Sequence, residues 1–249
     1  MSGRAPAEAG TLSPAASGPA LITGASSGIG RALAHELARR GKTLILQGRD
    51  QERLERTLDE VRAAGGDGRL VALDLTDDAA LDAWLASLAS TERALWALVH
   101  SAGLVRLGTL EASDVAVLDA HYRLNLRAPY RLTRALLPVL IRGRGQVVFV
   151  NSGAGLHAHA GWGAYAASKF GLRALADSLR QEVADRGVRV TSVYPGRTAT
   201  PMQRSVHEQE GRSYDPSAYV RAADVARQIA AVLELEPPSS VTDLTIRPT

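Results

Sequence analysis

The chain carries the stretch ALITGASSGIG at residues 20–30, in which a short apolar run leads into a turn rich in glycine and serine. Its glycines, Gly24, Gly28 and Gly30, permit a tight turn and a close approach of the backbone to a pyrophosphate. A helix expected from Gly28 to Arg40 would direct unpaired N–H groups and the positive end of its dipole toward that anion. Glycine-rich turns between a strand and a helix also occur for packing reasons, so this stretch alone leaves both interpretations open.

Short apolar runs and longer helical segments alternate along the rest of the chain. The expected strands are ALIT (20–23), TLILQ (43–47), RLVALD (69–74), ALWALVHSAG (94–103), QVVFVNS (146–152), RVTSVYPG (189–196) and VTDLTIRP (241–248). The expected helices span residues 28–40, 51–64, 78–90, 113–140, 164–186 and 222–235. This order predicts an α/β fold, a single Rossmann-type doubly wound parallel sheet with helices on both faces.

Three side chains suited to proton transfer follow at fixed intervals. Tyr165 and Lys169 lie four residues apart in AYAASKF, and Ser152 lies 13 residues before Tyr165. Positions i and i+4 of a helix share a face, so the phenol and the ammonium can reach one pocket. A tyrosine with a pKa near ~10 exchanges protons at neutral pH only when a nearby cation stabilises its phenolate. Each residue singly also fits a structural role, but together they predict proton transfer to a carbonyl oxygen.

The Thr-Gly-x-x-x-Gly-Ile-Gly turn, the interval from Ser152 to Tyr165 and the Tyr-x-x-x-Lys step together resemble the short-chain dehydrogenase/reductase family. Asn125, 27 residues before Ser152, lies where that family has its fourth catalytic residue. The resemblance implies that Ser152 orients a substrate carbonyl and that Tyr165 exchanges the proton. It further implies that Lys169 lowers the phenol pKa and holds the nicotinamide ribose, while Asn125 positions a water of the proton relay.

The resemblance also implies a set of cofactor-binding residues. They are Gly24, Ser26, Ser27, Gly28, Ile29, Gly30, Arg49, Asp74, Leu75, Ser101, Ala102, Gly103, Tyr165, Lys169, Pro195, Gly196 and Thr198. Asp74 is expected to contact the adenine. Where the family usually has Asn-Asn-Ala-Gly, this chain has His100, Ser101, Ala102 and Gly103, which removes two asparagine side chains and leaves the effect on cofactor affinity open.

The end of the second expected strand indicates which nicotinamide cofactor is preferred. An NAD site places a carboxylate there for the ribose 2′-hydroxyl, whereas an NADP site places a cation for the 2′-phosphate. Gly48 lies where the acid would be expected, and Arg49 follows it. Asp50 is the counter-argument, although its side chain should point away from Arg49 or start the next helix. We therefore expect NADP(H) to be preferred over NAD(H), with a solvated loop arginine as the alternative.

The substrate side is less defined by sequence. Ala154 and Trp162 lie in the stretch that lines the substrate pocket of the relatives, whereas His157 and His159 are expected to be exposed loop residues. The polar segment of about residues 199–219 lies where the family has a mobile lid, and a plain surface loop would look the same. No metal site is expected, because the chain has no cysteine and His157 and His159 have no nearby carboxylates. The remaining histidines, read as structural, are His35, His100, His121 and His207.

Composition restricts the partners and the domain organisation. With 249 residues and 45% hydrophobic content, the chain can form one domain. We expect residues 1–18, small, polar and proline-bearing, to be a flexible leader, and residues 19–249 to be a single dinucleotide-binding catalytic domain.

The 29 basic residues are scattered and aromatic residues are few, so no nucleic-acid binding is expected. No apolar stretch approaches the length of a membrane span, so we expect no membrane partner and a cytoplasmic location.

These observations lead to one main functional hypothesis and two alternatives. The main hypothesis is an NADP(H)-dependent oxidoreductase that reduces a small carbonyl compound or oxidises the corresponding alcohol. The alternatives are a 3-oxoacyl-thioester reductase, which would need a basic patch beside the pocket, and a non-catalytic NADPH-binding regulatory protein. The resemblance also implies a homodimer or homotetramer, packed through the helices that carry Asn125 and Tyr165.

Overall fold

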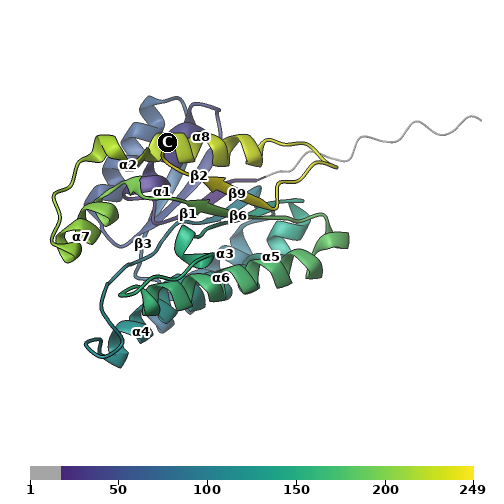
Figure 1. Cartoon of the computed structure of the whole chain (residues 1–249). Helices are drawn as coiled ribbons and strands as arrows, with labels where there is room; N and C mark the ends of the chain where they lie inside the picture. The colour runs from purple at the N-terminus through teal and green to yellow at the C-terminus, as the bar shows by residue number, and fades with distance from the viewer. Residues whose placement is uncertain (1–17) are drawn as a thin grey trace, which may run out of the picture.

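The computed structural model describes residues 18–249, and all but the last residue of the expected leader lies outside them. A parallel sheet with the strand order β3-β2-β1-β4-β5-β6-β9 forms the centre (Figure 1). Its strands are β1 (Ala20–Thr23), β2 (Thr43–Gly48), β3 (Asp67–Ala72), β4 (Ala97–His100), β5 (Gln146–Val150), β6 (Arg189–Pro195) and β9 (Asp243–Ile246). The expected doubly wound α/β fold is confirmed.

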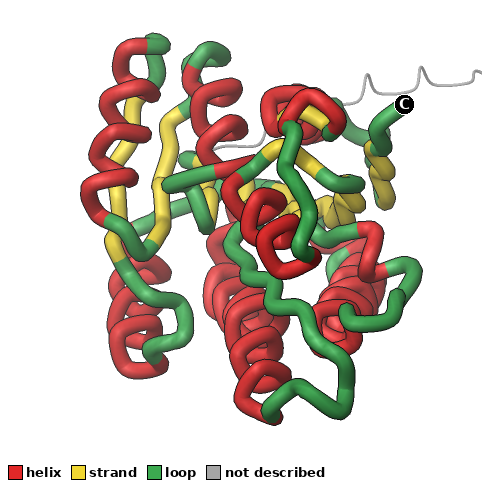
Figure 2. The backbone as a smooth tube through the Cα atoms, turned by 60° about the vertical axis from the view of Figure 1, so that its left-hand side comes forward, coloured by secondary structure: helices red, strands yellow, loops and turns green. Residues whose placement is uncertain are grey.

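Helices cover both faces of this sheet. They are α1 (Gly28–Ala38), α2 (Gln51–Ala63), α3 (Asp78–Thr91), α4 (Val115–His121), α5 (Ala128–Arg142), α6 (Gly163–Glu182), α7 (Pro201–Glu210) and α8 (Ala222–Leu233). Figure 1 shows α1, α2 and α8 on one side of the sheet and α3, α5 and α6 on the other, and Figure 2 shows the strands between helices. The layers explain why the strands read as continuous apolar runs: Leu21 packs into the core under α3 and α5, and its neighbour Ile22 packs into the core under α1 and α8.

The long helix expected over residues 113–140 is interrupted in the structure. Its α4 and α5 parts are joined by a π-helical segment, Tyr122–Arg127, which contains Asn125. Asp114 caps the N-terminus of α4 by accepting a hydrogen bond from Ala116 N. Single π turns inside α-helices are rare and are frequent at functional sites, so this interruption is consistent with a functional position for Asn125.

The polar segment expected as a lid or loop contains a helix that the sequence reading did not predict. Thr200 caps α7 by accepting from Gln203 N, and Pro201 occupies the first helical turn. Gly211 ends the helix with φ +64°, a left-handed conformation favoured by glycine. Two short strands, β7 (Thr198–Ala199) and β8 (Val220–Arg221), pair at the base of the segment. The segment is therefore a folded substructure attached to the carboxyl end of β6.

Candidate active site

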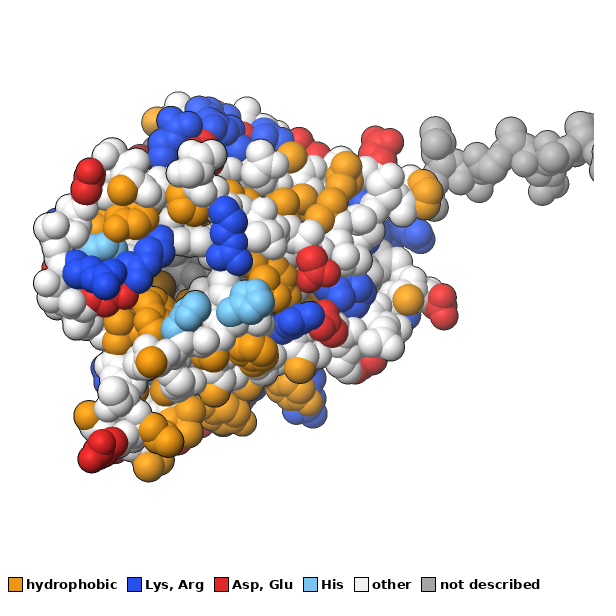
Figure 3. Space-filling view, in the orientation of Figure 1, with side chains coloured by type: hydrophobic (Ala, Val, Ile, Leu, Met, Phe, Trp, Pro, Cys, Tyr) orange, Lys and Arg blue, Asp and Glu red, His pale blue; other side chains and the backbone are white. Residues whose placement is uncertain are grey.

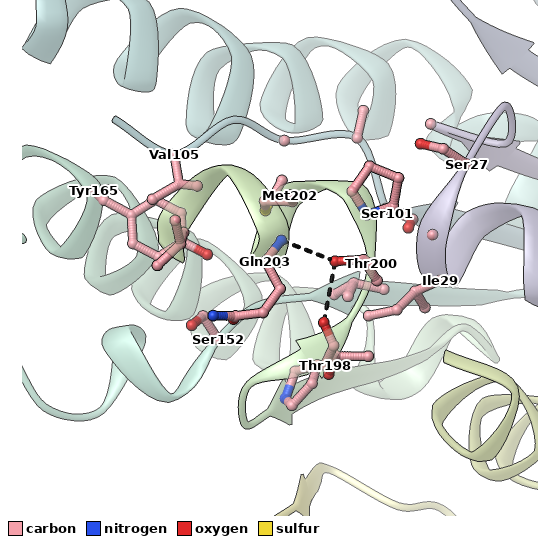
Figure 4. A pocket seen from close by; sticks show the side chains of 18 of the residues that line it. Ser27, Ile29, Ser101, Val105, Ser152, Tyr165, Thr198, Thr200, Met202 and Gln203 are labelled. Carbon is pink, nitrogen blue, oxygen red and sulfur yellow. Dashed lines mark hydrogen bonds between the residues drawn. The ribbon is translucent and has the colours of Figure 1, made fainter. Parts of the chain in front are cut away.

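A cavity of about 1170 Å³ opens at the carboxyl ends of the parallel strands. Its walls come from the turn after β1, the ends of β2, β4, β5 and β6, and helix α7. Open α/β sheets bind ligands at this edge, because the loops that follow the strands meet there. Figure 4 shows Ser152 and Tyr165 on one side of this space and Met202 and Gln203 of α7 beside them. The cavity exceeds what a small molecule alone needs and can accommodate a dinucleotide with a substrate.

The glycine-rich turn has the backbone that the sequence predicts. Gly24 and Gly28 have φ values of +67° and +54°, which L side chains rarely adopt. A Cβ on Gly24 would lie 2.8 Å from the Cα of Ala102. Helix α1 starts at Gly28, and its N-cap residue Ser27 makes no side-chain capping bond. Because Ser26, Ser27, Gly28 and Ile29 all line the cavity, the helix N-terminus faces it.

Gly30 and Asp74 occupy different surroundings from the rest of the predicted cofactor set. Neither is among the residues that line the cavity. A Cβ on Gly30 would lie 2.4 Å from the carbonyl oxygen of Gly24, so this glycine serves the close packing of α1 on the turn. The Asp74 carboxylate accepts hydrogen bonds from the backbone N–H and hydroxyl of Thr76, at 2.8 and 2.7 Å. Burial is the largest single effect on the pKa of Asp74 and would raise it. The two Thr76 bonds and the charges of Arg49 and Arg123 together outweigh burial, so the pKa of Asp74 is lowered from its usual value.

The end of β2 is basic and crowded. A Cβ on Gly48 would lie 3.2 Å from Ser26 Oγ, which leaves little room for an acidic side chain at this position. The Arg49 guanidinium is largely exposed, with its Nη1 3.9 Å from Asp74 Oδ2. The Asp50 carboxylate caps α2 by accepting from Arg53 N at 3.0 Å, which confirms that it starts the next helix. Arg53, which the sequence reading did not single out, lines the cavity beside Arg49.

Ser152, Tyr165 and Lys169 lie in the same cavity wall. Ser152 follows β5, and its hydroxyl accepts from Ala154 N at 3.1 Å. Burial raises the pKa of Tyr165, and a hydrogen bond with Ser152 partly opposes that shift. The Tyr165 phenol is thus held protonated in this structure, and the expected lowering of its pKa by Lys169 is not found.

Lys169 is buried beneath Tyr165. Its Nζ donates to the carbonyl oxygen of Val150 at 3.1 Å and lies 5.8 Å from the centroid of the Tyr165 ring. Desolvation lowers the pKa of Lys169 to about 8. The ammonium therefore predominates at neutral pH, although its removal from water is costly.

Asn125 joins two parts of the site. Its amide donates to Leu104 O and to Ser168 Oγ, both at 3.0 Å, and its oxygen accepts from Leu104 N at 2.9 Å. The π-helical turn places this buried side chain between the loop after β4 and helix α6. Asn125 thus fixes the loop that carries Ser101 to Gly103 relative to the helix that carries Tyr165.

Thr23 is a site residue that the sequence reading missed. Its hydroxyl accepts from the N–H groups of Ser101 and Ala102, at 3.1 and 3.2 Å, and lies 3.4 Å from Val99 O. It holds the end of β4 where this chain lacks the family's usual asparagines. The sequence signal for this role was Thr23 itself, the first residue of the Thr-Gly-x-x-x-Gly-Ile-Gly turn, because a hydroxyl at a strand end can accept hydrogen bonds from neighbouring backbone groups.

Two histidines that the sequence analysis predicted to be structural, His100 and His121, lie close to the site. His100 is buried and stacked on Phe149, with Nε2 2.8 Å from the Thr133 hydroxyl, and burial lowers its pKa to about 3. His121 bonds Val117 O through Nδ1 and accepts from Arg106 N at Nε2. Its ring lies edge-on to the ring of Tyr165, 5.9 Å between centroids. Desolvation lowers the pKa of His121, so a neutral ring supports the phenol.

The substrate side of the cavity combines an apolar wall with α7. Ala154 and Trp162 line it, and the Trp162 ring packs edge-on against Tyr165 with 5.8 Å between centroids. His159 also lines the cavity, whereas His157 does not. Figure 4 shows Val105 and Met202 facing the same space. This wall suits an apolar portion of a small ligand.

The remaining predicted cofactor residues after β6, Pro195, Gly196 and Thr198, line the cavity as well. Within residues 18–249, no three His, Asp or Glu side chains gather closely enough to hold a metal ion. No helix in that range combines the length and apolar character required to cross a bilayer.

Comparison with known proteins gives consistent matches. The short chain dehydrogenase family profile matches residues 19–211. The oxidoreductase UcpA of Salmonella typhimurium is 35% identical over 220 residues, which cover 87% of this chain and 83% of the relative. An alcohol dehydrogenase of the archaeon Thermococcus sibiricus, solved with 5-hydroxy-NADP, has a TM-score of 0.82 at 26% identity and covers 92% of this chain and 96% of its own. A metagenomic short-chain oxidoreductase in complex with NADP has a TM-score of 0.78 at 32% identity, with the same coverage of both chains.

Proposed function

The chain belongs to the short-chain dehydrogenase family of oxidoreductases, and from this we propose that it uses NADP(H) to reduce a small carbonyl compound or to oxidise the corresponding alcohol. The observation that carries the proposal is the placement of Ser152, Tyr165 and Lys169 in the wall of one cavity that also reaches the glycine-rich turn. A sensor of cofactor would need the turn but not a buried proton donor. We therefore assign residues 19–249 to one catalytic domain, with residues 199–219 as its lid.

The proposed cofactor site extends along the carboxyl edge of the sheet. Gly24, Ser26, Ser27, Gly28 and Ile29 would hold the pyrophosphate through backbone N–H groups at the start of α1. Leu75, Ser101, Ala102 and Gly103 would enclose the adenosine and ribose, while Pro195, Gly196 and Thr198 would flank the nicotinamide. The positive φ of Gly24 and Gly28 supports this arrangement, because a side chain there would disturb the turn.

The proposed mechanism assigns a separate role to each polar side chain of the site. The nicotinamide supplies or accepts the hydride when bound. Ser152 donates a hydrogen bond to the substrate carbonyl oxygen and orients it toward Tyr165. Tyr165 delivers its phenolic proton to that oxygen during reduction and takes it back during oxidation. Lys169, buried below the ring, stabilises the resulting phenolate, and Asn125 positions the water from which the proton is replaced.

Preference for NADP(H) over NAD(H) is part of the proposal. The Arg49 guanidinium can bind a 2′-phosphate through two parallel hydrogen bonds, and Arg53 adds a second positive charge beside it. Gly48 carries no carboxylate, and the crowding around it leaves little room for an acidic side chain at that position. Both solved relatives described above contain NADP or its derivative.

The decisive experiment measures NADPH and NADH oxidation with a panel of ketones, aldehydes and acyl-thioesters, and NADP⁺ reduction with alcohols. Tyr165→Phe is expected to lower kcat by roughly 10²- to 10⁴-fold while leaving NADPH affinity unchanged, because only the proton donor is lost. Tyr130→Phe, on the exposed surface of α5, is the matched control and should behave as wild type. Full activity of Tyr165→Phe would refute the mechanism, and tight NADPH binding without turnover in either protein would favour the regulatory alternative.

A separate measurement tests the cofactor preference. Arg49→Ala is expected to raise the Kd of NADPH by roughly 10-fold or more and to leave that of NADH nearly unchanged. Fluorescence titration with both cofactors measures this directly. Equal affinity of wild type for NADPH and NADH would refute the preference.

We also propose a homodimer or homotetramer formed through the face of α4, the π-helical turn and α6. Leu118, Tyr122 and Phe170 on these elements are 45%, 50% and 41% exposed, which is unusual for large apolar side chains. Figure 3 shows hydrophobic side chains along the lower side of the molecule, where α4 and α6 lie in Figure 1. A monomer in sedimentation velocity at micromolar concentration would contradict this assembly.

A further inference from the structure

The substrate end of the cavity carries more positive than negative charge. Arg197, Arg212 and Arg247 line it together with a single carboxylate, Glu210, and with His159. Figure 3 shows Lys or Arg and His side chains around the hollow on this face. The reacting residues beneath this rim contribute no carboxylate.

The three arginines are not equivalent. Arg197 forms a bidentate pair with Glu210, with contacts of 2.8 and 2.5 Å, which neutralises both groups and fixes the end of α7. Arg212 is 70% exposed and reaches the same carboxylate only at 4.0 Å. Arg247 has neither an ion pair nor a side-chain hydrogen bond with any residue in the described range 18–249. Of the three, Arg247 is therefore the arginine without an ionic partner among the described residues, and its side chain is exposed.

The backbone holds Arg247 close to the proposed reaction centre. Strand β9 pairs in parallel with β6, and the carbonyl oxygen of Ile246 accepts from Gly196 N at 2.7 Å, so Arg247 follows directly beside the carboxyl end of β6. A Cβ built on Gly153 would lie 2.6 Å from Arg247 Nη1. Since adjacent Cα atoms are 3.8 Å apart, the guanidinium lies within about 8 Å of the Cα of Ser152.

Arg247 lies far along the sheet edge from the groups assigned to the cofactor phosphates. The guanidinium lies over Gly153, which follows β5. The strand order places β5 two strands from β1, which precedes the glycine-rich turn, and three strands from β2, which precedes Arg49. At about 4.8 Å per strand these separations are roughly 10 and 14 Å. A second anion bound at Arg247 would therefore be part of the substrate and not of the dinucleotide.

We propose that the substrate of this enzyme is a compact oxo acid or hydroxy acid whose carboxylate pairs with Arg247 while its carbonyl or hydroxyl group meets Ser152 and Tyr165. This inference rests on the proposed oxidoreductase function and names its substrate class. Arg247 acts as a specificity residue: its planar fork binds a carboxylate through two hydrogen bonds and fixes the distance from anion to reacting carbon. The apolar wall formed by Val105, Trp162 and Met202 would contact the carbon chain between or beside these groups.

The test compares oxo acids with their uncharged methyl esters. NADPH oxidation is measured with 2-oxobutanoate, acetoacetate and 4-oxopentanoate beside the three esters, using wild type, Arg247→Gln and the control Arg186→Gln. Arg186 is an exposed arginine that precedes β6, so it lies at the amino ends of the strands, away from the cavity at their carboxyl ends. Wild type is expected to favour at least one acid over its ester by 10-fold or more in kcat/KM. Arg247→Gln should lower kcat/KM for that acid by roughly 10- to 100-fold, mainly through KM, and change ester turnover less than twofold.

Several results would overturn the proposal. One is equal use of acids and esters by wild type, and another is an equal loss of both in Arg247→Gln. A fall in NADPH affinity of Arg247→Gln as large as the fall in kcat/KM would assign the arginine to the cofactor. Preference for acetoacetyl-coenzyme A over acetoacetate, lost in Arg247→Gln, would assign it to thioester substrates.

A binding measurement separates failure of this inference from failure of the proposed function. If no compound in the panel is turned over, the oxidoreductase function fails for this class, and malonate binding is then measured by calorimetry with NADPH present and absent. Malonate binding to wild type but not to Arg247→Gln sustains the anion site. Equal or absent binding in the two proteins overturns it.

Discussion

Replacing Lys169 by methionine should remove a pH-dependent component of the free energy of unfolding. Lys169 is 4% exposed, and its Nζ has one protein acceptor, Val150 O, within the described residues. Desolvation lowers its pKa from 10.5 to about 8. Methionine has a similar length and flexibility and needs no solvation, so it fits the same space without a charge.

The sign and size of the effect follow from proton linkage. Between pH 8 and 10.5 the unfolded chain binds a proton at Lys169 that the folded chain has released, so stability rises with pH in this window. Below pH 8 both states are protonated, and the full desolvation cost of about 3 kcal/mol is present. From pH 7 to pH 10 wild type should therefore gain about 2.5 kcal/mol relative to Lys169→Met.

Urea unfolding at pH 7, 8, 9 and 10, followed by circular dichroism, measures this difference. Burial raises the pKa of Tyr165 and Tyr194, which lowers stability mainly above pH 10, so the comparison stops at that pH. Lys42→Met, at the chain's other lysine, controls for the loss of a lysine outside the cavity. Parallel stability profiles for wild type and Lys169→Met would refute the assignment of a lowered pKa to this residue.

Two further predictions concern the framework of the site. Gly24→Ala should destabilise the fold by about 2–5 kcal/mol and weaken NADPH binding, because φ +67° strains alanine and the new Cβ would meet the backbone of Ala102 at 2.8 Å. Gly211→Ala has nearly the same φ, +64°, but open space around the Cβ, and should cost only about 1–2 kcal/mol; equal losses in urea unfolding would contradict the packing argument. Asn125→Ala should cost about 2–4 kcal/mol, since it leaves both backbone groups of Leu104 without their partner, and it should lower kcat as well as stability. Full stability of Asn125→Ala in urea would show that water or a neighbouring group replaces the amide.

Local sequence signals were sufficient for the central sheet. The apolar runs around Leu21 and Leu98 are too short for membrane spans and too continuous for one-sided strands, so only a sheet covered on both faces satisfies them. Their boundaries shifted by a few residues: the run at 94–103 is a strand only from Ala97 to His100, since the residues after it turn into the cavity. The caps Asp50 and Asp77 start α2 and α3 at the expected places because their carboxylates satisfy free N–H groups.

Helix α7 and the π-helical turn at Asn125 were not predicted. The sequence of α7 is strongly polar, and this polarity indicated a loop or lid instead of a helix. Thr200, Pro201 and Gly211 are nevertheless recognisable start and stop signals of a helix. The π turn has no local signature, because it is stabilised by the bonds that Asn125 makes to Leu104 and Ser168, residues distant in the sequence.

The sequence by itself determined the α/β class, the glycine-rich turn and the spacing of Ser152, Tyr165 and Lys169, because these depend on local periodicity and on intervals along one chain. Only the tertiary structure decided which side chains meet across the cavity. Thr23 bonds to Ser101 some 78 residues away, and Arg247 lies over Gly153 because β9 pairs with β6. The physical reason is that desolvation, ion pairing and close packing depend on distances through space, which no local pattern of residues records.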